Sequence, residues 1–366
     1  MDVILLRGVC SFANRGLERL ATSMSQIQSE LRPEEQSARF FHVPWKSLVF
    51  GGLGGSVGLL SILLGVAVYI VETLTKPKRL QSAIDLYTFT PFELNLPAEE
   101  VAFPPLKGDH LVSGWYIPAQ NATATILICP GYRGQRSDVL GMCAQLWRAG
   151  YNVLAFEYYG HGAIVGAPVT LGYREINDFL GAVAYAKERA PQTRLGAIGY
   201  SMGAAVSIMG SARTPEVEVL VADCPFATHE SAVSYAVYRT IHLPFSLFHW
   251  LTDLILWLRA GYHFHQVEPL RDIAKIAPRP IMLIQGMKDT IVNPRDALLL
   301  YEAAQEPKEL WLLPNVDHCG AYFDDRQTYI NRVISFFDLY LRQVPATSSV
   351  PGQAQAQQAP RLSEAS

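Results

Sequence analysis

The sequence is poor in charged residues. Lys, Arg, Asp and Glu make up 17% of its 366 residues, whereas about a quarter is usual for soluble domains. The formal net charge is −3, and no long run of like charge is present. Nucleic-acid binding needs a basic patch or stripe, so we expect no nucleic-acid partner.

Cysteine is also scarce. The five cysteines form an odd number, and no two of them have the CxxC spacing. Disulfide frameworks usually show even numbers, and zinc sites usually show paired spacings. We therefore expect no disulfide framework, no zinc or other metal site and no cofactor, and we interpret most of these cysteines as small buried side chains. They are Cys10, Cys129, Cys143, Cys224 and Cys319.

One segment lacks charge altogether. Residues 47–71 read SLVFGGLGGSVGLLSILLGVAVYIV, which is 25 residues between Lys46 and Glu72. About 20 apolar residues are enough for a helix to cross the hydrocarbon core of a bilayer. The segment is too long, and begins too far into the chain, for an ordinary signal peptide. We predict a transmembrane helix over 47–72 in a single-pass membrane protein, with a buried core helix as the alternative.

The flanks of this segment leave its orientation open. Basic residues favour the cytoplasmic side, and three lie near each end, so the side of the membrane on which the C-terminal part lies stays unresolved. The spacings Gly51-x-x-x-Gly55 and Gly54-x-x-x-Gly58 are typical of helices that pack closely in membranes. A homodimer through this helix is therefore one expectation.

The rest of the chain divides into a tail, a linker, one large domain and a second tail. Residues 1–46 are polar and lack a clear period, and 73–94 link the apolar segment to a domain over 95–343. Residues 344–366 are low-complexity and almost free of bulky apolar side chains. Because such a segment buries too little apolar surface to offset the entropy of ordering, we expect 344–366 to be disordered.

Short apolar runs alternate with amphipathic stretches across the domain. Two runs on either side of Gly108-Asp109 predict an antiparallel hairpin, and the nearly all-apolar runs that follow are typical of a parallel sheet covered on both faces. We predict an α/β fold with a mostly parallel, eight-stranded sheet flanked by helices. The expected strands are 99–103, 111–117, 124–129, 152–156, 194–199, 217–222, 280–285 and 309–313, and the expected helices include 137–148, 172–189, 295–304 and 327–342.

One connection in this pattern is unusually long. About 55 residues separate the strand that ends near Ala222 from the strand near Pro280, where crossovers commonly need far fewer. The insert is rich in aromatic residues, among them Trp250 and Trp257. We predict that residues of the insert, about 227–270, form a helical lid over the carboxyl-terminal edge of the sheet, with an ordinary core helix as the alternative.

Ser201 is the candidate nucleophile. It lies in Gly199-Tyr200-Ser201-Met202-Gly203, a GxSxG motif between a predicted strand and a predicted helix. This is the context of a nucleophile elbow, a tight turn that presents the serine Oγ above the sheet edge. Small flanking residues leave room for the turn. A structural serine in a glycine-rich turn is the alternative.

A serine hydroxyl needs a base, and the base needs an orienting carboxylate. Asp289 and His318 follow successive strands in the order Ser, Asp, His that sheets with such an elbow use, and the carboxyl ends of these strands are where such sheets place their sites. We predict His318 as the general base and Asp289 as its partner. Asp223 is the second candidate acid, and Asp317 is too close to His318 along the chain.

Backbone N–H donors must stabilise the oxyanion of a tetrahedral intermediate. Met202 follows the nucleophile and supplies the first predicted donor. The second lies in the turn Pro130-Gly131-Tyr132 after the strand 124–129. There Gly131 allows close approach of the backbone, and Tyr132 is the predicted donor.

Together these motifs resemble the α/β-hydrolase superfamily, and most closely its serine-aminopeptidase-like and membrane-anchored abhydrolase-domain branches. The resemblance covers about 95–342 and implies the α/β-hydrolase fold. Two positions depart from the family pattern: Pro130 replaces a frequent His, and Glu157 replaces a frequent Asp. The motifs are CPGYRG (129–134), EYYGHG (157–162), GYSMG (199–203), ADCPF (222–226), GMKDTIV (286–292) and DHCG (317–320).

These observations predict a membrane-anchored serine hydrolase that cleaves an ester through an acyl-enzyme intermediate. The apolar segment and the aromatic insert favour an apolar substrate, so the expected substrate is a small-molecule or lipid ester. A serine peptidase or amidase is an alternative, because the same triad cleaves amides. A non-catalytic scaffold is another, and the presence of Ser201, Asp289 and His318 argues against it.

Overall fold

The computed structural model describes residues 45–76, 89–162 and 167–342, with side chains of the first segment described from Gly58 onward. The expectations for the N-terminal tail up to residue 44, for most of the linker and for the C-terminal tail 344–366 lie outside the described residues.

An eight-stranded sheet forms the centre of the domain, in the order β1-β2-β4-β3-β5-β6-β7-β8. β1 and β2 form the predicted antiparallel hairpin, β2 pairs antiparallel with β4, and the remaining neighbours are parallel. Every predicted strand agrees with the observed one to within one residue at each end. The strands are β1 (Glu99–Phe103), β2 (Val112–Ile117), β3 (Ala124–Cys129), β4 (Asn152–Phe156), β5 (Arg194–Tyr200), β6 (Val217–Asp223), β7 (Ile281–Gly286) and β8 (Lys308–Leu313).

Helices cover both faces of the sheet, because alternate side chains of a strand point to opposite faces. In β3, Leu127 enters the core under α4 and α5, whereas Ile126 enters the core under α3 and α11. A short 3₁₀ turn, η3 (Arg136–Val139), precedes α3 where one longer helix was predicted, and a π-helical turn, η7 (Asp338–Arg342), follows α11. The helices are α3 (Leu140–Arg148), α4 (Glu175–Arg189), α5 (Met202–Ser211), α9 (Arg295–Ala303), α10 (Ala321–Asp324) and α11 (Arg326–Phe337).

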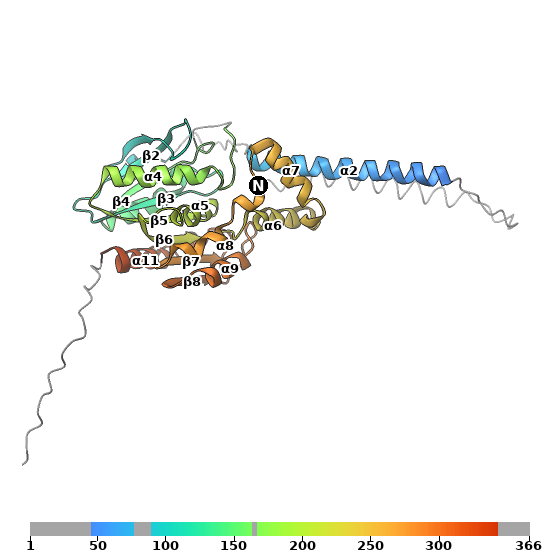
Figure 1. Ribbon diagram of the computed structural model, residues 1–366. Helices are drawn as coiled ribbons and strands as arrows, with labels where there is room; N and C mark the ends of the chain where they lie inside the picture. The colour runs from blue at the N-terminus through green and yellow to red at the C-terminus, as the bar shows by residue number, and fades with distance from the viewer. Residues whose placement is uncertain (1–44, 77–88, 163–166, 343–366) are drawn as a thin grey trace, which may run out of the picture.

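The insert between β6 and β7 is helical, as predicted. Its two long helices are α6 (His229–Ile241) and α7 (His249–Ala260), followed by η5 (Phe264–Gln266), α8 (Pro269–Asp272) and η6 (Ile273–Ile276); a 3₁₀ turn, η4 (Phe245–Leu247), separates the first two. Figure 1 shows α6 and α7 beside the end of the long helix α2. The insert lies against α2, and the Tyr235 hydroxyl of α6 also donates to the Asp289 carbonyl at 2.9 Å, so the insert contacts both α2 and the carboxyl-terminal edge of the sheet.

Helix α2 (Trp45–Thr75) is 31 residues long and extends beyond both ends of the predicted 47–72. It projects from the domain in Figure 1, and its segment Gly58–Thr75 is long and apolar enough to cross a membrane by length and composition. Ala67 and Val71 are buried in the domain core, whereas Leu60 and Ile62 are exposed. The helix is therefore docked at its C-terminal end and exposed in the part that precedes it.

Three contacts hold the docked end of α2. The Tyr132 hydroxyl lies within donating distance of the carbonyl oxygens of Thr73, at 2.9 Å, and Leu74, at 3.0 Å. The N–H of Val169 donates to the carbonyl of Thr75 at 3.0 Å. These bonds satisfy carbonyls of the last helical turn that have no partner within the helix. The end of α2 is consequently tied to the turn that follows β3.

Candidate active site

Ser201 sits on a sharp turn between β5 and α5. Its backbone has φ 53° and ψ −116°, outside the regions that side chains with a Cβ normally adopt. The Ser201 N–H donates to the carbonyl of Asp223 at 2.8 Å, which ties the turn to the end of β6. Such strain persists only where the surroundings hold it, and it presents the hydroxyl at the sheet edge.

The two glycines of the motif make this turn possible. A Cβ on Gly203 would lie 2.3 Å from the carbonyl oxygens of Cys129 and Pro130, and a Cβ on Gly199 would lie 2.4 Å from the carbonyl oxygen of Gly203. All of these neighbours are backbone atoms, which cannot rotate aside. The glycines thus let α5 approach β3 and β5 closely enough to bring Ser201 beside the turn after β3.

His318 and Asp289 form a close pair. The Nδ1 atom of His318 lies 2.7 Å from Oδ2 of Asp289. The other carboxylate oxygen of Asp289 accepts from the N–H groups of Ile291 and Val292, each at 2.8 Å, and Oδ2 also accepts from the Gln285 amide at 3.0 Å. Asp289 is almost fully buried. Its carboxylate is therefore fixed, and it orients the imidazole ring.

The other two acids have different partners. The buried Asp223 carboxylate accepts from the Tyr329 hydroxyl at 2.7 Å, and burial raises its pKa to about 6. Asp317 accepts from the N–H groups of Thr290 and of His318 itself, at 2.9 Å and 2.7 Å, and so shapes the turn. The structure brings Asp289, and neither of these acids, to the ring of His318.

The surroundings of His318 stabilise its charged form. Burial alone would lower the pKa of His318, but the Asp289 carboxylate and the Cys224 thiol outweigh burial and raise this pKa to about 10. A raised pKa strengthens the neutral imidazole as a base, but it also keeps the ring protonated, and unable to accept a proton, at lower pH. His318 must be neutral before it can take a proton from a hydroxyl, so its raised pKa makes such a reaction favour alkaline pH.

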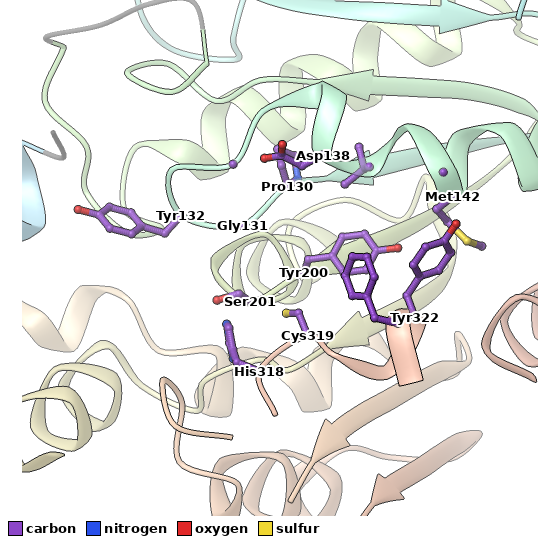
Figure 2. A pocket seen from close by; sticks show the side chains of 14 residues that line it. Pro130, Gly131, Tyr132, Asp138, Met142, Tyr200, Ser201, His318, Cys319 and Tyr322 are labelled. Carbon is purple, nitrogen blue, oxygen red and sulfur yellow. The ribbon is translucent and has the colours of Figure 1, made fainter. Parts of the chain in front are cut away.

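A cavity of about 300 Å³ opens over Ser201 and His318. Figure 2 shows the Ser201 hydroxyl and the His318 ring facing each other at one end of it. The remaining wall is largely apolar and includes Met142, Tyr322 and Phe323. The residues that line the described cavity come from the turn after β3, from η3 and α3, from the elbow and from the segment after β8, and none comes from the insert.

Of the two predicted oxyanion donors, Tyr132 lines this cavity, and Met202 directly follows Ser201, which lines it as well. Met202 is the first residue of α5, where backbone N–H groups lack partners within the helix. A Cβ on Gly131 would lie 3.3 Å from the carbonyl oxygen of Tyr200 and 3.4 Å from the Ser201 Cβ, so the turn after β3 closely approaches the elbow. The Tyr132 ring points away from Ser201 toward α2 (Figure 2), which leaves its backbone N–H as the group available to the site.

Two thiols lie at the site that the sequence analysis did not assign to it. Cys224, after β6, and Cys319, after His318, are both free, and the Cys319 N–H donates to the Cys224 sulfur at 3.2 Å. Cys319 lines the cavity beside Ser201. The signal that could have found them is their position, because both follow parallel strands whose carboxyl ends meet at one sheet edge.

Known proteins share this fold. The family model described as serine aminopeptidase, S33, matches residues 120–261. The structure of the esterase PF2001 of Pyrococcus furiosus superposes with a TM-score of 0.60 and 26% identity, covering 73% of this chain and 98% of that one. The protein has the α/β-hydrolase fold. Its curated relatives include YqkD of Bacillus subtilis, 29% identical over 62% of this chain and 75% of the relative, and YfhR of Escherichia coli (strain K12), 29% identical over 65% and 80%.

The similar esterase structure and the family match support hydrolase activity for this protein. The family match spans the turn after β3 and the elbow, and it ends before Asp289 and His318. The assignment of Asp289 and His318 to the candidate site therefore depends on the geometry described above.

Proposed function

We propose that this α/β-hydrolase is a membrane-anchored serine esterase that cleaves carboxylic esters with an apolar acyl group. The observation that carries the proposal is the strained elbow at Ser201 facing the His318–Asp289 pair across one cavity. The esterase of Pyrococcus furiosus, similar over 73% of this chain, supports the choice of an ester as substrate.

In the proposed reaction the Ser201 oxygen attacks the ester carbonyl carbon while His318 Nε2 takes the hydroxyl proton. The N–H groups of Met202 and Tyr132 stabilise the oxyanion that forms, and Asp289 stabilises the imidazolium. The intermediate collapses, and the alcohol leaves with the proton from His318. Water then attacks the acyl-enzyme, giving its proton to His318, and the acid leaves as Ser201 recovers its hydrogen.

Exposed apolar side chains support the membrane anchor. On α2, Leu60 and Ile62 are exposed, and on the adjacent α7, Trp257 and Leu258 are exposed, the last to 66%. Large contiguous apolar surface marks a contact with protein or membrane, and Trp near the end of a span suits the lipid interface. The docking of α2 beside α6 and α7 would thus bring the insert to the bilayer surface. A homodimer through α2, and the side of the membrane, stay predictions.

An activity-based probe tests the nucleophile. Wild-type protein in detergent should react with a fluorophosphonate, and Ser201→Ala should not. Ser207→Ala is the matched control, because Ser207 is buried on the same helix and donates to the Ala204 carbonyl. Equal labelling of wild type and Ser201→Ala would disprove the nucleophile. A wild type that neither labels nor hydrolyses p-nitrophenyl esters of any chain length would support a scaffold.

Truncation tests the anchor. Removing residues 1–64 deletes the exposed part of α2 and keeps the buried Ala67 and Val71. The truncated protein should lose much of its sedimentation with membranes while retaining hydrolysis of a soluble ester. Removing residues 1–72 is a poorer test because it also deletes those two core side chains. Sedimentation equal to that of the full chain would contradict α2 as the main anchor.

A serine aminopeptidase is a second candidate function, favoured by the description of the family model and by one acidic residue at the cavity. Asp138 lines the cavity, where a carboxylate can bind a free amino terminus. It also accepts from the Gln135 N–H at 2.8 Å, so it caps its own turn. Aminoacyl anilides decide between the two functions. The peptidase would be favoured if the protein cleaves these anilides faster than esters and if the KM for the anilide rises in Asp138→Asn.

A further inference from the structure

Three potential metal ligands converge at the same sheet edge as Ser201. Cys224 follows β6, while His318 and Cys319 follow β8. One ligand atom from each side chain lies within 4.8 Å of those of the other two. Thiolate sulfur and imidazole nitrogen are the ligands that zinc prefers in proteins. The sequence analysis expected no zinc site because the three residues are not paired along the chain.

We propose that Cys224, His318 and Cys319 form a Zn²⁺ site, and that zinc bound there inhibits hydrolysis by occupying His318. The proposal that zinc binds does not depend on which reaction the protein catalyses. The inhibition rests on the proposed function, in which His318 is the general base. Serine catalysis and zinc binding then compete for one imidazole nitrogen.

The spacing suits a tetrahedral ion after a small adjustment. Zn–S bonds of about 2.3 Å place two sulfur ligands about 3.8 Å apart. The observed separations of at most 4.8 Å therefore need to contract by about 1 Å or less, which side-chain rotation can supply. Cys319 and His318 line the cavity, so the fourth position faces its interior, where water or the Ser201 hydroxyl can bind.

The hydrogen bonding of His318 resembles that of a metal ligand. Its Nδ1 atom is 2.7 Å from the Asp289 carboxylate, which leaves Nε2 for the ion. Zinc-binding histidines usually place their other ring nitrogen on a carboxylate or carbonyl, which sets the tautomer and strengthens the ligand. The Asp289 carboxylate is itself held by the N–H groups of Ile291 and Val292. A partner suited to catalysis is thus equally suited to zinc.

The backbone at both thiols is strained. Cys224 has φ 53° and Cys319 has φ 50°, a region in which glycine incurs no steric cost. The two sulfurs and a ring nitrogen of His318 lie within 4.8 Å of one another, and the Cys319 N–H donates to the Cys224 sulfur. Cysteine thus occupies two backbone positions beside His318 that glycine would adopt at a lower steric cost.

The binding step balances in charge and involves no oxidation. Zn²⁺ displaces one proton from each thiol and, where His318 is an imidazolium, the proton on Nε2 as well; it then accepts the Nε2 lone pair, and the two thiolates offset its charge. The site is mostly enclosed, so the neutral complex avoids the large free energy of burying an unpaired charge.

Metal binding is measured first, on the full chain in detergent, reduced and then kept under argon. Co²⁺ should bind with one equivalent and give the intense near-ultraviolet absorption of thiolate-to-cobalt charge transfer, and Zn²⁺ should displace it. Cys224→Ala and Cys319→Ala should each lose this absorption. Cys143→Ala, a buried cysteine on α3, is the matched control and should bind like wild type. Asp289→Asn should bind roughly 10–100-fold more weakly, the usual effect of losing an outer partner.

Hydrolysis of a p-nitrophenyl ester in zinc-buffered solution is measured next, and each variant is compared with its own metal-free rate. Wild type and Cys143→Ala should lose activity as zinc saturates the site and recover it on chelation, whereas Cys224→Ala and Cys319→Ala should respond at least about 100-fold less sensitively. Absent binding, or equal binding by the Cys224 and Cys319 variants, would overturn the site. Saturated binding with unchanged hydrolysis would overturn the inhibition. A wild type that binds cobalt as described yet hydrolyses no ester would count against the proposed function and leave the zinc site supported.

Discussion

Replacing Asp289 with Asn tests how the carboxylate orients His318, and it also removes the acceptor of the Gln285 amide. The Asn side chain has the size of Asp, and its oxygen can still accept from the N–H groups of Ile291 and Val292. Its NH₂ group then faces His318 Nδ1 in place of a carboxylate oxygen. Because Nδ1 must now accept, the ring proton moves to Nε2, toward Ser201, and the imidazole can no longer act as a base.

The structure sets the size of this effect. A pKa of about 10 for His318, against an ordinary 6.5, corresponds to about 5 kcal/mol of net imidazolium stabilisation, to which the Asp289 carboxylate contributes together with the Cys224 thiol. Loss of 5 kcal/mol from a transition state is roughly a 10,000-fold loss of rate. The same magnitude is typical when the wrong tautomer is imposed in a Ser-His-Asp triad. We expect kcat to fall by about that factor with little change in KM.

The assay is the pH dependence of kcat/KM on a soluble p-nitrophenyl ester. In wild type the pKa of His318 is raised, so the neutral base accumulates only as pH rises, and activity should fall as pH drops through a value well above 6.5. In Asp289→Asn the pH at which activity falls should be lower, because the negative charge that stabilises the imidazolium is gone.

Asp223→Asn is the matched control. It changes a buried carboxylate at the end of the neighbouring strand whose partner is Tyr329 and not His318. It should retain activity within about tenfold of wild type. Equal losses in the two variants, or a loss of less than tenfold in Asp289→Asn, would refute the reasoning that only Asp289 orients the base.

Three further predictions concern the elbow, the docked helix and the membrane surface. Gly203→Ala puts a Cβ 2.3 Å from two backbone carbonyl oxygens and should destabilise the fold by more than about 3 kcal/mol, visible as a lower Tm; an unchanged Tm would show that α5 can shift. Tyr132→Phe removes the bonds to the Thr73 and Leu74 carbonyls and should lower stability by about 1 kcal/mol and reduce kcat more than it raises KM; unaltered kinetics would contradict coupling between α2 and the oxyanion turn. Leu258→Glu should reduce hydrolysis of esters held in lipid vesicles relative to a soluble ester, and an unchanged ratio would argue against contact between α7 and the bilayer.

Local patterns were enough to predict most of the fold and to select the candidate site residues that the structure brings to one sheet edge. Each strand is a short apolar run ended by a turn, and such runs are visible without knowing their neighbours in space. The elbow at Ser201 is equally local, since its glycines, strand and helix adjoin in sequence. The order of Asp289 and His318 placed them at the correct sheet edge because strands run parallel there.

The contacts between distant segments needed the tertiary structure. Asp223, Asp289 and Asp317 all lie near His318 by topology, and only the geometry shows that Asp289 reaches its Nδ1 atom. The insert was expected over the cavity, but an amphipathic helix pattern reveals which face is apolar and not what that face contacts. The structure places the insert beside α2, with the hydroxyl of Tyr132 on the end of the same helix.

The thiols show the same limit most clearly. The sequence by itself determined that Cys224 and Cys319 each follow a strand, but they are 95 positions apart, and nothing in their spacing indicates contact. Sheet order and two left-handed backbone residues bring them together beside His318. Chain-local chemistry thus determined the sheet, the elbow and the candidate triad. Packing across the sheet edge decided the partner of His318, the docking of α2 and the meeting of the two thiols, because these depend on distances that no local pattern encodes.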